Sequence, residues 1–450
     1  MRTPLPLVFS IVFAFLSVVL SGCPSSSRTS PQVLHEEHEG GPPTGEYPTS
    51  PKEAAPPDKP ENVQALKESG ATLETNAQGN VTSVTLGPSG GDAELAQLKG
   101  LLHVKELVAH GRGVTDAGLA SLATHPSLRT LSLQQSAITN DGLAHLVKVP
   151  RLEDIQLKQT DITAEGYKHL AKIASLKRIR APQTNFSDEC LAALKDCTQL
   201  ELLDLQDNNA VTEDGLAVLA GWKNLKSLRL YGPNITDKVM TYIADKINLK
   251  SLSLEQSAVT VAGFETIQGL IALQELSLYG ATNVDDETLA KIGNFKKLLK
   301  LELRSTSVSR KGMQHLVDLK ELKLLDLSET AMKDEGLAAL IDLPQLEDLN
   351  LWQSLVTDAG LPHLGKMRQL KRLNLDKCEI SDAGLPHLKG LTNLEYLNLS
   401  YANVTDAGLL ENLSDLDKLA KLELNFVADV TDEGIAKLKV AIPALEEVNR

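Results

Sequence analysis

Residues 370–393 read LKRLNLDKCEISDAGLPHLKGLTN, and residues 394–417 read LEYLNLSYANVTDAGLLENLSDLD. The two stretches share leucines, a Ser-Asp or Thr-Asp pair and a Gly-Leu pair at the same places. Their common pattern, LxxLxLxxTxITDxGLxxLxxLxx, has a period of 24 residues and runs from about Val104 to the end of the sequence. Such a period predicts a solenoid of stacked copies, an architecture that usually presents a surface rather than performing chemistry.

Counting from the first leucine-type position gives fourteen repeats and a terminal half-repeat at 445–448. The repeats start at Val104, Leu128, Leu152, Leu176, Leu200, Leu225, Leu249, Leu273, Leu298, Leu322, Leu346, Leu370, Leu394 and Leu419. One-residue insertions at 207–210 and 281–283 fall in expected loops, where a solenoid tolerates them. The repeat at 176–199 has Ala181-Pro182 in place of a leucine and its follower, which predicts a local kink or an altered strand.

The repeat predicts an α/β fold with a parallel β-sheet on the concave face and helices on the convex face. In LxxLxL the alternating leucines point inward from a short strand, and the residues between them face outward. Thr or Ser follows in twelve of the fourteen repeats, as helix N-caps do, and the Asp after it suits the positive end of the helix dipole. The recurring glycine would be costly inside a helix, so we expect a side chain there to collide with the neighbouring repeat.

Composition excludes several kinds of function. The net charge of −14 makes nucleic acid a poor partner, because binding a duplex requires Lys and Arg at the phosphates. The sequence shows no nucleophile elbow, phosphate loop or zinc-protease motif, so we expect neither an enzyme nor a cofactor or metal site. Cys190, Cys197 and Cys378 do not cluster, and we interpret all three as small buried residues.

The first 60 residues predict export and a membrane anchor. An apolar run from Leu5 to Leu20 is long enough for a signal peptide and short for a spanning helix. It ends in Leu20-Ser21-Gly22-Cys23, which resembles the bacterial lipobox, so residues 1–22 would be removed and Cys23 lipidated. The alternative is an ordinary cleaved signal peptide with an incidental cysteine. By resemblance to sorted lipoproteins, Pro24 after the cysteine favours the outer membrane, in a periplasmic or surface-facing position.

Two segments connect the predicted anchor to the repeats. Residues 23–60 are rich in Pro, Ser and Gly and have almost no large apolar residue, which predicts a disordered tether. Residues 61–103 predict an N-terminal cap and a first irregular repeat. The cap would contain a short helix and a hairpin, and would cover leucines that the first repeat leaves open to water. Residues 104–450 complete the predicted repeat domain.

The repeat unit resembles that of the leucine-rich repeat superfamily. It is most similar to the TDxGL-bearing type common in bacterial repeat proteins and close to the repeats of eukaryotic F-box proteins. The resemblance covers residues 81 to 450. It implies a right-handed horseshoe or arc, with partner recognition on the concave face. The F-box function does not carry over, because no additional N-terminal helical module is visible.

Aromatic residues at positions expected to be solvated form the candidate site. They are predicted to lie on outward strand positions of the concave face: Tyr231, Tyr279, Trp352, Tyr396, Tyr401 and Phe426. Clustered exposed aromatics indicate a binding patch, whereas the alternative is that aromatics simply favour strands. Acidic residues also crowd the middle and later repeats: Glu275, Glu302, Asp326, Glu329, Asp348 and Asp376. Basic residues lie earlier: Lys158, Arg178 and Arg180.

Two functions of different class remain. The first is a lipid-anchored, monomeric recognition module that holds a protein or polysaccharide on its concave face, with an acidic trough beside an aromatic platform. The second is a structural or spacer protein of the cell envelope without a specific ligand. The first predicts that concave substitutions abolish partner binding, and the second predicts that they are silent.

Overall fold

The leucine pairs form the short strands that the repeat predicts. The structure is a computed structural model and describes residues 56–450. The predicted signal peptide, Cys23 and nearly all of the predicted tether lie outside the described residues. Within the described part, no helix has both the length and the apolar character needed to cross a membrane.

Seventeen strands in the described residues build one sheet. They are β1 (Thr72–Thr75), β2 (Val81–Thr85), β3 (Glu106–Val108), β4 (Thr130–Ser132), β5 (Asp154–Gln156), β6 (Arg178–Arg180), β7 (Leu202–Asp204), β8 (Ser227–Tyr231), β9 (Ser251–Glu255), β10 (Glu275–Ser277), β11 (Lys300–Glu302), β12 (Leu324–Asp326), β13 (Asp348–Asn350), β14 (Arg372–Asn374), β15 (Tyr396–Asn398), β16 (Lys421–Glu423) and β17 (Glu447–Asn449). From β2 to β17 each strand pairs parallel with the next along the chain.

Helices return the chain from one strand to the next. The α-helices are α1 (Pro60–Glu68), α2 (Asp92–Gln97), α3 (Asp116–Leu122), α4 (Asn140–Leu146), α5 (Ala164–Leu170), α6 (Asp188–Ala193), α7 (Asp237–Ile243), α8 (Val261–Thr266), α9 (Asp286–Ile292), α10 (Leu337–Leu340), α11 (Leu361–Leu364), α12 (Asp406–Leu413) and α13 (Asp432–Ala441). Short 3-10 helices are η1 (Leu98–Gly100), η2 (Gly215–Gly221), η3 (Gly312–His315), η4 (Asp334–Gly336), η5 (Asp358–Gly360) and η6 (Leu385–Leu388).

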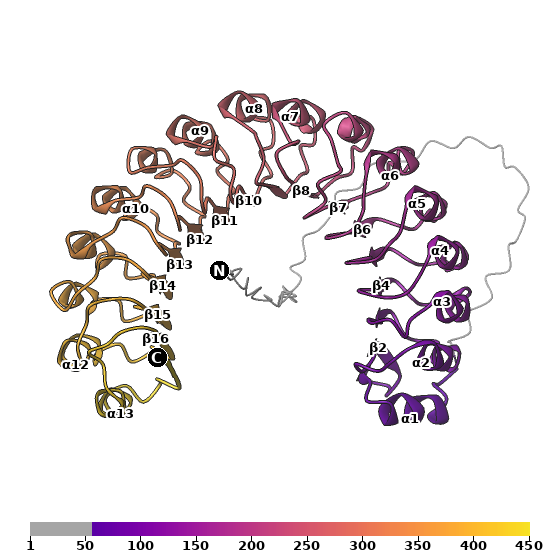
Figure 1. The fold of residues 1–450 in the computed structure, drawn as a ribbon, viewed down its shortest axis with the longest axis horizontal. Coiled ribbons are helices and arrows are strands. Elements are labelled where there is room, and N and C mark those ends of the chain that lie inside the picture. Colours follow the sequence, from indigo (N-terminus) through magenta and orange to yellow (C-terminus); the bar gives the residue numbers. More distant parts are fainter. Residues whose placement is uncertain (1–55) are drawn as a thin grey trace, which may run out of the picture. The chain divides into compact units, whose positions relative to one another are not determined.

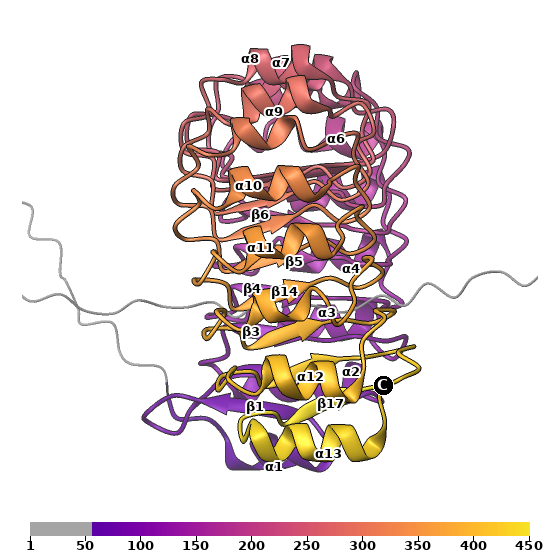
Figure 2. The same cartoon turned by 90° about the vertical axis from the view of Figure 1, so that its left-hand side faces the viewer.

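The strands line the inner side of an open arc formed by residues 56–450, and the helices line its outer side (Figure 1). Turned by 90°, the same unit shows strands and helices stacked repeat upon repeat (Figure 2). The pairing is in register with the repeat, so that Leu349, Leu373 and Leu397 lie side by side and are fully buried. The predicted fold class is confirmed.

The N-terminal end of the sheet begins with a hairpin. Helix α1 precedes strands β1 and β2, which pair antiparallel with a register shift after Glu74. Strand β2 also pairs parallel with β3. Its Val81 and Val84, and Leu86 directly after it, are buried as the leucines of later repeats are. The elements at the N-terminal end therefore cover one end of the core and also begin the repeat pattern.

The kink predicted in the repeat at 176–199 is wrong. Strand β6 pairs with β5 and β7 in the ordinary register, and Ala181 is buried. Tyr167 and Phe186 pack there edge to face, with ring centroids 4.7 Å apart, and both are fully buried. These two large side chains supply volume in a repeat that has lost a leucine. Cys190, Cys197 and Cys378 are free and buried, as predicted.

The Thr-Asp and glycine positions form one junction between repeats. The Asp358 carboxylate accepts hydrogen bonds from the backbone N–H and the hydroxyl of Ser381 in the next repeat, at 2.8 and 2.5 Å. A Cβ atom on Gly384 would lie closer than 3.0 Å to the same carboxylate. The predicted collision is therefore confirmed, and the obstacle is the Asp side chain of the preceding repeat. Eight other aspartates make the same pair of bonds.

The exceptions in the sequence support this explanation of the glycine. Four junctions have neither Asp nor Asn at the carboxylate position, and three of them have also lost the glycine. The pairs are Ala164 with Cys190, Glu213 with Val239, and Val261 with Thr288. In the fourth junction, Arg310 occupies the carboxylate position and the next repeat retains its glycine, Gly336. Glycine is thus needed mainly where an Asp or Asn side chain of the preceding repeat occupies the space.

Candidate partner-binding surface

The eighth position of every repeat turns the chain away from the sheet in a left-handed backbone conformation. Three repeats have glycine there: Gly111, Gly232 and Gly280. The other eleven have side chains, with φ between 53° and 64°: Gln135, Gln159, Gln183, Asp207, Gln256, Ser305, Glu329, Gln353, Lys377, Tyr401 and Phe426. For a residue other than glycine this conformation costs about 1–2 kcal/mol. Bulky side chains are therefore the least expected residues at the eighth position.

Tyr401 and Phe426 are the aromatic residues in this left-handed row. Their φ angles are 64° and 62°, and their side chains are 48% and 75% exposed. Their rings stack on each other with centroids 4.7 Å apart. Neither ring fills the core, and a glycine would relieve the backbone at both places. The fold alone therefore does not account for aromatic residues here.

The structure corrects where the six aromatics lie. Only Tyr231, which ends β8, and Tyr396 in β15 belong to strands. Tyr279 and Trp352 are at the seventh position of their repeats, and Tyr401 and Phe426 are at the eighth, beyond the strand ends. Most strands are only three residues long and end at the fifth position of the repeat. The four residues therefore lie along the edge of the concave face where the strands end.

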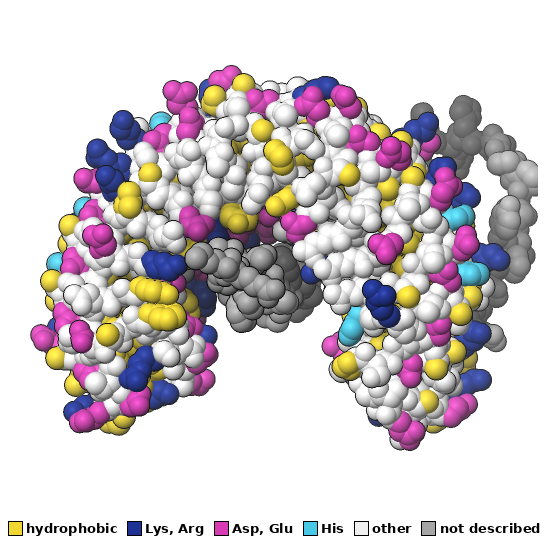
Figure 3. Space-filling view, viewed as in Figure 1, with side chains coloured by type: hydrophobic (Ala, Val, Ile, Leu, Met, Phe, Trp, Pro, Cys, Tyr) yellow, Lys and Arg dark blue, Asp and Glu magenta, His cyan; other side chains and the backbone are white. Residues whose placement is uncertain are grey.

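Two basic side chains lie between these rings. The Arg304 guanidinium is 5.0 Å from the ring centre of Tyr279 and 4.6 Å from that of Trp352. The Lys377 ammonium is 5.3 Å from the ring centre of Trp352 and 5.4 Å from that of Tyr401. We call this row of Tyr279, Arg304, Trp352, Lys377, Tyr401 and Phe426 the aromatic rim. Figure 3 shows hydrophobic and basic side chains together at the inner edge of the later repeats.

The two cations of the rim differ in their ionic partners. The Arg304 Nε lies 2.9 Å from the Glu329 carboxylate, which also accepts a 2.5 Å hydrogen bond from Ser305. The pKa of Glu329 is lowered overall, because these bonds and nearby cations outweigh the effect of its burial. Among the described residues, Lys377 has no carboxylate within 4.0 Å. The predicted site omitted both Arg304 and Lys377, although their repeat positions match those of Trp352 and Tyr401.

Part of the predicted acidic trough is neutralised by basic side chains on the same or the next strand. Glu302 pairs with Lys300 at 2.9 Å, and Asp348 pairs with Arg372 at 3.2 Å. The earlier basic residues Arg178 and Arg180 both pair with Asp154. Basic side chains therefore interrupt the predicted acidic trough. Among the described residues, the concave carboxylates left without a cation within 4.0 Å include Glu255, Asp326 and Asp376.

Burial raises the pKa of Glu255, Asp326 and Asp376. Asp326 accepts bonds from Ser328 and from the Asn350 amide, which lower its pKa but do not outweigh the burial. The Oδ1 atom of Asp376 is buried and has no hydrogen-bond partner. The nearby cations Arg229 and Lys377 lower the pKa values of Glu255 and Asp376 but do not outweigh the burial, and neither cation forms an ion pair with these carboxylates.

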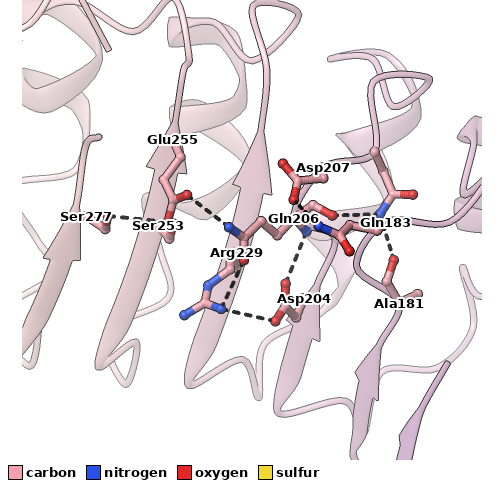
Figure 4. Close-up of polar contacts among 10 residues, drawn as sticks. Ala181, Gln183, Asp204, Gln206, Asp207, Arg229, Ser253, Glu255 and Ser277 are labelled. Atoms are coloured by element: carbon pink, nitrogen blue, oxygen red, sulfur yellow. Dashed lines mark hydrogen bonds and ion pairs between the residues drawn. The ribbon is translucent and has the colours of Figure 1, made fainter. Parts of the chain in front are cut away.

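Neutral donors on β9 itself, on β10 and just after β7 hold the Glu255 carboxylate (Figure 4). It accepts hydrogen bonds from Ser253 at 2.8 Å, from Ser277 at 3.4 Å and from the Gln206 amide at 3.2 Å. Gln206 in turn accepts a 3.4 Å bond from Arg229, whose guanidinium also contacts Asp204. The carboxylate is therefore fixed in place while its charge remains unpaired.

The described residues hold no group of three or more His, Cys, Asp or Glu side chains arranged for a metal ion. The aromatic rim and the unpaired carboxylates are typical of a partner-binding surface rather than of a catalytic site. Tyr231 occupies the seventh repeat position, as Tyr279 and Trp352 do, but it ends a strand. Tyr396 packs under the Arg372 guanidinium at 4.3 Å.

Replacing Phe426 by glycine is expected to change the free energy of unfolding by less than about 1 kcal/mol. Relief of the left-handed strain offsets the lost stacking and the added freedom of glycine in the unfolded chain. Leu422→Ala, at a fully buried position four residues earlier in β16, should cost about 2–5 kcal/mol. Urea unfolding followed by circular dichroism compares the two. A Phe426→Gly loss as large as that of Leu422→Ala would show that the ring is structural.

Comparison with known proteins supports the fold class. Residues 366–385 and 390–411 match the family model described as Leucine Rich repeat. No curated protein sequence matches the chain. Together with the parallel sheet and the outer helices, these findings define a leucine-rich repeat solenoid. Proteins of this class are typically non-catalytic interaction scaffolds.

Three solved structures share the fold. An internalin (inlF) from Listeria monocytogenes is 18% identical, with a TM-score of 0.51 over 87% of this chain and 94% of that one. A leucine-rich repeat protein of Leptospira interrogans is 18% identical, with a TM-score of 0.50 over 86% of this chain and 97% of that one. A chain from the Rad7–Elc1 complex of yeast is 18% identical, with a TM-score of 0.51 over 75% of this chain and 84% of that one.

Proposed function

We propose that this protein is an envelope-anchored recognition module that binds a protein partner through the aromatic rim and the adjoining concave face. The observation that carries the proposal is the pair Tyr401 and Phe426. Both rings are exposed, both require an unfavourable left-handed backbone, and neither contributes to the core. Backbone strain at an exposed aromatic pair that does not stabilise the core is best explained by a role in binding a partner.

The arrangement of the rim supports the same function. Trp352 and Tyr401 hold the Lys377 ammonium between them, so the row is ordered before any partner arrives. A preordered surface loses less side-chain entropy on binding than a mobile one. Aromatic and Arg side chains are also the residues that most often dominate binding energy at protein interfaces. The likeness to an internalin and to a member of a protein complex concerns the fold alone.

The anchor is a separate part of the proposal, and the sequence around Cys23 supports it. Wild-type protein expressed in a bacterial host is expected to incorporate a labelled fatty acid and to sediment with membranes. Cys23→Ser should take up no label and stay soluble, because the thiol that would carry the lipid is gone. Absence of label from the wild type would remove the anchor from the account without affecting the binding surface.

A further inference from the structure

We infer that the partner segment held by this concave face is an extended, arginine-bearing stretch of polypeptide that crosses strands β9 to β14. This inference rests on the proposed function and names the chemistry of its partner. Three carboxylates on this part of the sheet, Glu255, Asp326 and Asp376, have no cation within 4.0 Å in the described chain. A guanidinium on each would supply the missing partner.

The surroundings of the three carboxylates indicate that a cationic partner segment would bind there. Neighbouring carboxylates such as Glu302 and Asp348 are paired by Lys300 and Arg372 on the same or the next strand. Glu255 and Asp326 receive only neutral donors, and the buried Oδ1 of Asp376 receives none. Their pKa values are raised by burial, so each would gain a stronger interaction from an incoming cation than a fully solvated carboxylate would.

The positions of the carboxylates set the spacing of the cations. Neighbouring strands lie about 4.8 Å apart, so the separation measured across the strands is about 14 Å from Glu255 to Asp326 and about 10 Å from Asp326 to Asp376, with Asp326 two positions earlier in its repeat than the other two. An extended chain advances about 3.3 Å per residue. Cations about four and then about three residues apart would therefore reach the three carboxylates in turn.

Arginine fits this surface better than lysine. The rings of the aromatic rim can stack with a planar guanidinium, and a carboxylate can accept two parallel hydrogen bonds from it. The molecule already uses the same contacts internally, since Arg304 lies between Tyr279 and Trp352 and bonds to Glu329. A lysine would keep the charge but lose the planar stacking and the second hydrogen bond.

The test uses fluorescein-labelled synthetic peptides and the full chain, with binding followed by fluorescence anisotropy. The first peptide has Arg at its first, fifth and eighth residues on a Ser-Gly-Ala background. The second places the three Arg together, and the third replaces Arg by Lys at the original spacing. We expect the spaced Arg peptide to bind at least about tenfold more tightly than the clustered one, and several-fold more tightly than the Lys peptide.

The variant Asp326→Asn plus Asp376→Asn is expected to weaken the spaced peptide at least about tenfold and to remain folded. Burial disfavours the charged form of both groups, so their neutralisation removes no stabilising charge from the fold. The matched control is Glu287→Gln plus Glu335→Gln, two exposed carboxylates on the helical side, with the same change in net charge. The control should leave binding unchanged, and circular dichroism should show all variants folded.

Binding should also weaken as the pH falls. A cation favours the ionised carboxylates, and their raised pKa values mean that protonation begins at a higher pH than for ordinary carboxylates. Equal binding of spaced and clustered peptides, equal loss in the helical-side control, or no binding at all would each overturn the inference. Those outcomes concern the partner's chemistry. The proposed recognition function fails separately, if a partner is held equally well without the aromatic rim.

Discussion

Gly408→Ala is expected to destabilise the protein by about 2–4 kcal/mol, a large effect for one added methyl group. The Asp382 carboxylate accepts hydrogen bonds from the N–H and the hydroxyl of Thr405, at 2.9 and 2.7 Å. A Cβ at position 408 would overlap that carboxylate. The carboxylate must then move and lose both bonds, or the two repeats must separate. The denaturant concentration at the unfolding midpoint gives the change.

The double variant Asp382→Ala plus Gly408→Ala separates steric conflict from loss of glycine. Asp382→Ala alone removes two hydrogen bonds and should cost about 1–3 kcal/mol. The double variant should be more stable than the sum of the two single changes predicts, because the obstacle to the methyl group is gone. The natural pair Ala164 and Cys190 already has this form. Additive losses would show that the aspartate is not the reason for the glycine.

Trp352→Ala plus Tyr401→Ala is expected to weaken partner binding by at least about 30-fold, since central aromatic residues at interfaces each contribute about 2 kcal/mol or more. The change also frees Lys377 from both of its rings and leaves Arg304 with only Tyr279. The measurement is the amount of partner retained by immobilised protein over a concentration series. A matched control is Gln135→Ala plus Gln159→Ala, two side chains at the same repeat position as Tyr401 in earlier repeats.

The control pair should retain the partner at the wild-type level, although it also removes side chains from the edge of the sheet. Unfolding curves of both double variants are needed, because a lower stability could imitate a loss of binding. Full retention by the Trp352 and Tyr401 variant would leave the spacer function as the better account.

The sequence was sufficient for features that every repeat shares. The inward leucines, the N-cap residues and the glycine collision follow from a regular period, because each copy meets the same neighbours. Asp358 shows the limit of that reasoning. Its dipole role was inferred from its own helix, but its two hydrogen bonds go to Ser381 of the next repeat. Contacts between copies become visible only when the offset between neighbouring repeats is known.

The sequence predicted several residues of the candidate site, but it predicted their positions on the fold less well. Trp352, Tyr401 and Phe426 were identified as residues that the repeat does not require. Their place beyond the strands follows because most strands end at the fifth position of the repeat, and the left-handed eighth residue is glycine in only three repeats, which gives a weak sequence signal for it. Arg304 and Lys377 were missed because single basic residues look like ordinary solvated side chains. Aligning the seventh and eighth positions of all repeats would have placed them beside the aromatics.

The central claim is that a partner lies against the aromatic rim. A photo-crosslinking amino acid at position 353 tests it most directly, with the same substitution at position 135 as the comparison. Gln353 and Gln135 are both exposed, both occupy the eighth repeat position and both have a φ of 53°. We expect a discrete crosslinked protein from envelope extracts at 353, none at 135, and loss of the product when Trp352→Ala and Tyr401→Ala are added. The same product at both positions, or its survival without the two rings, would contradict the account.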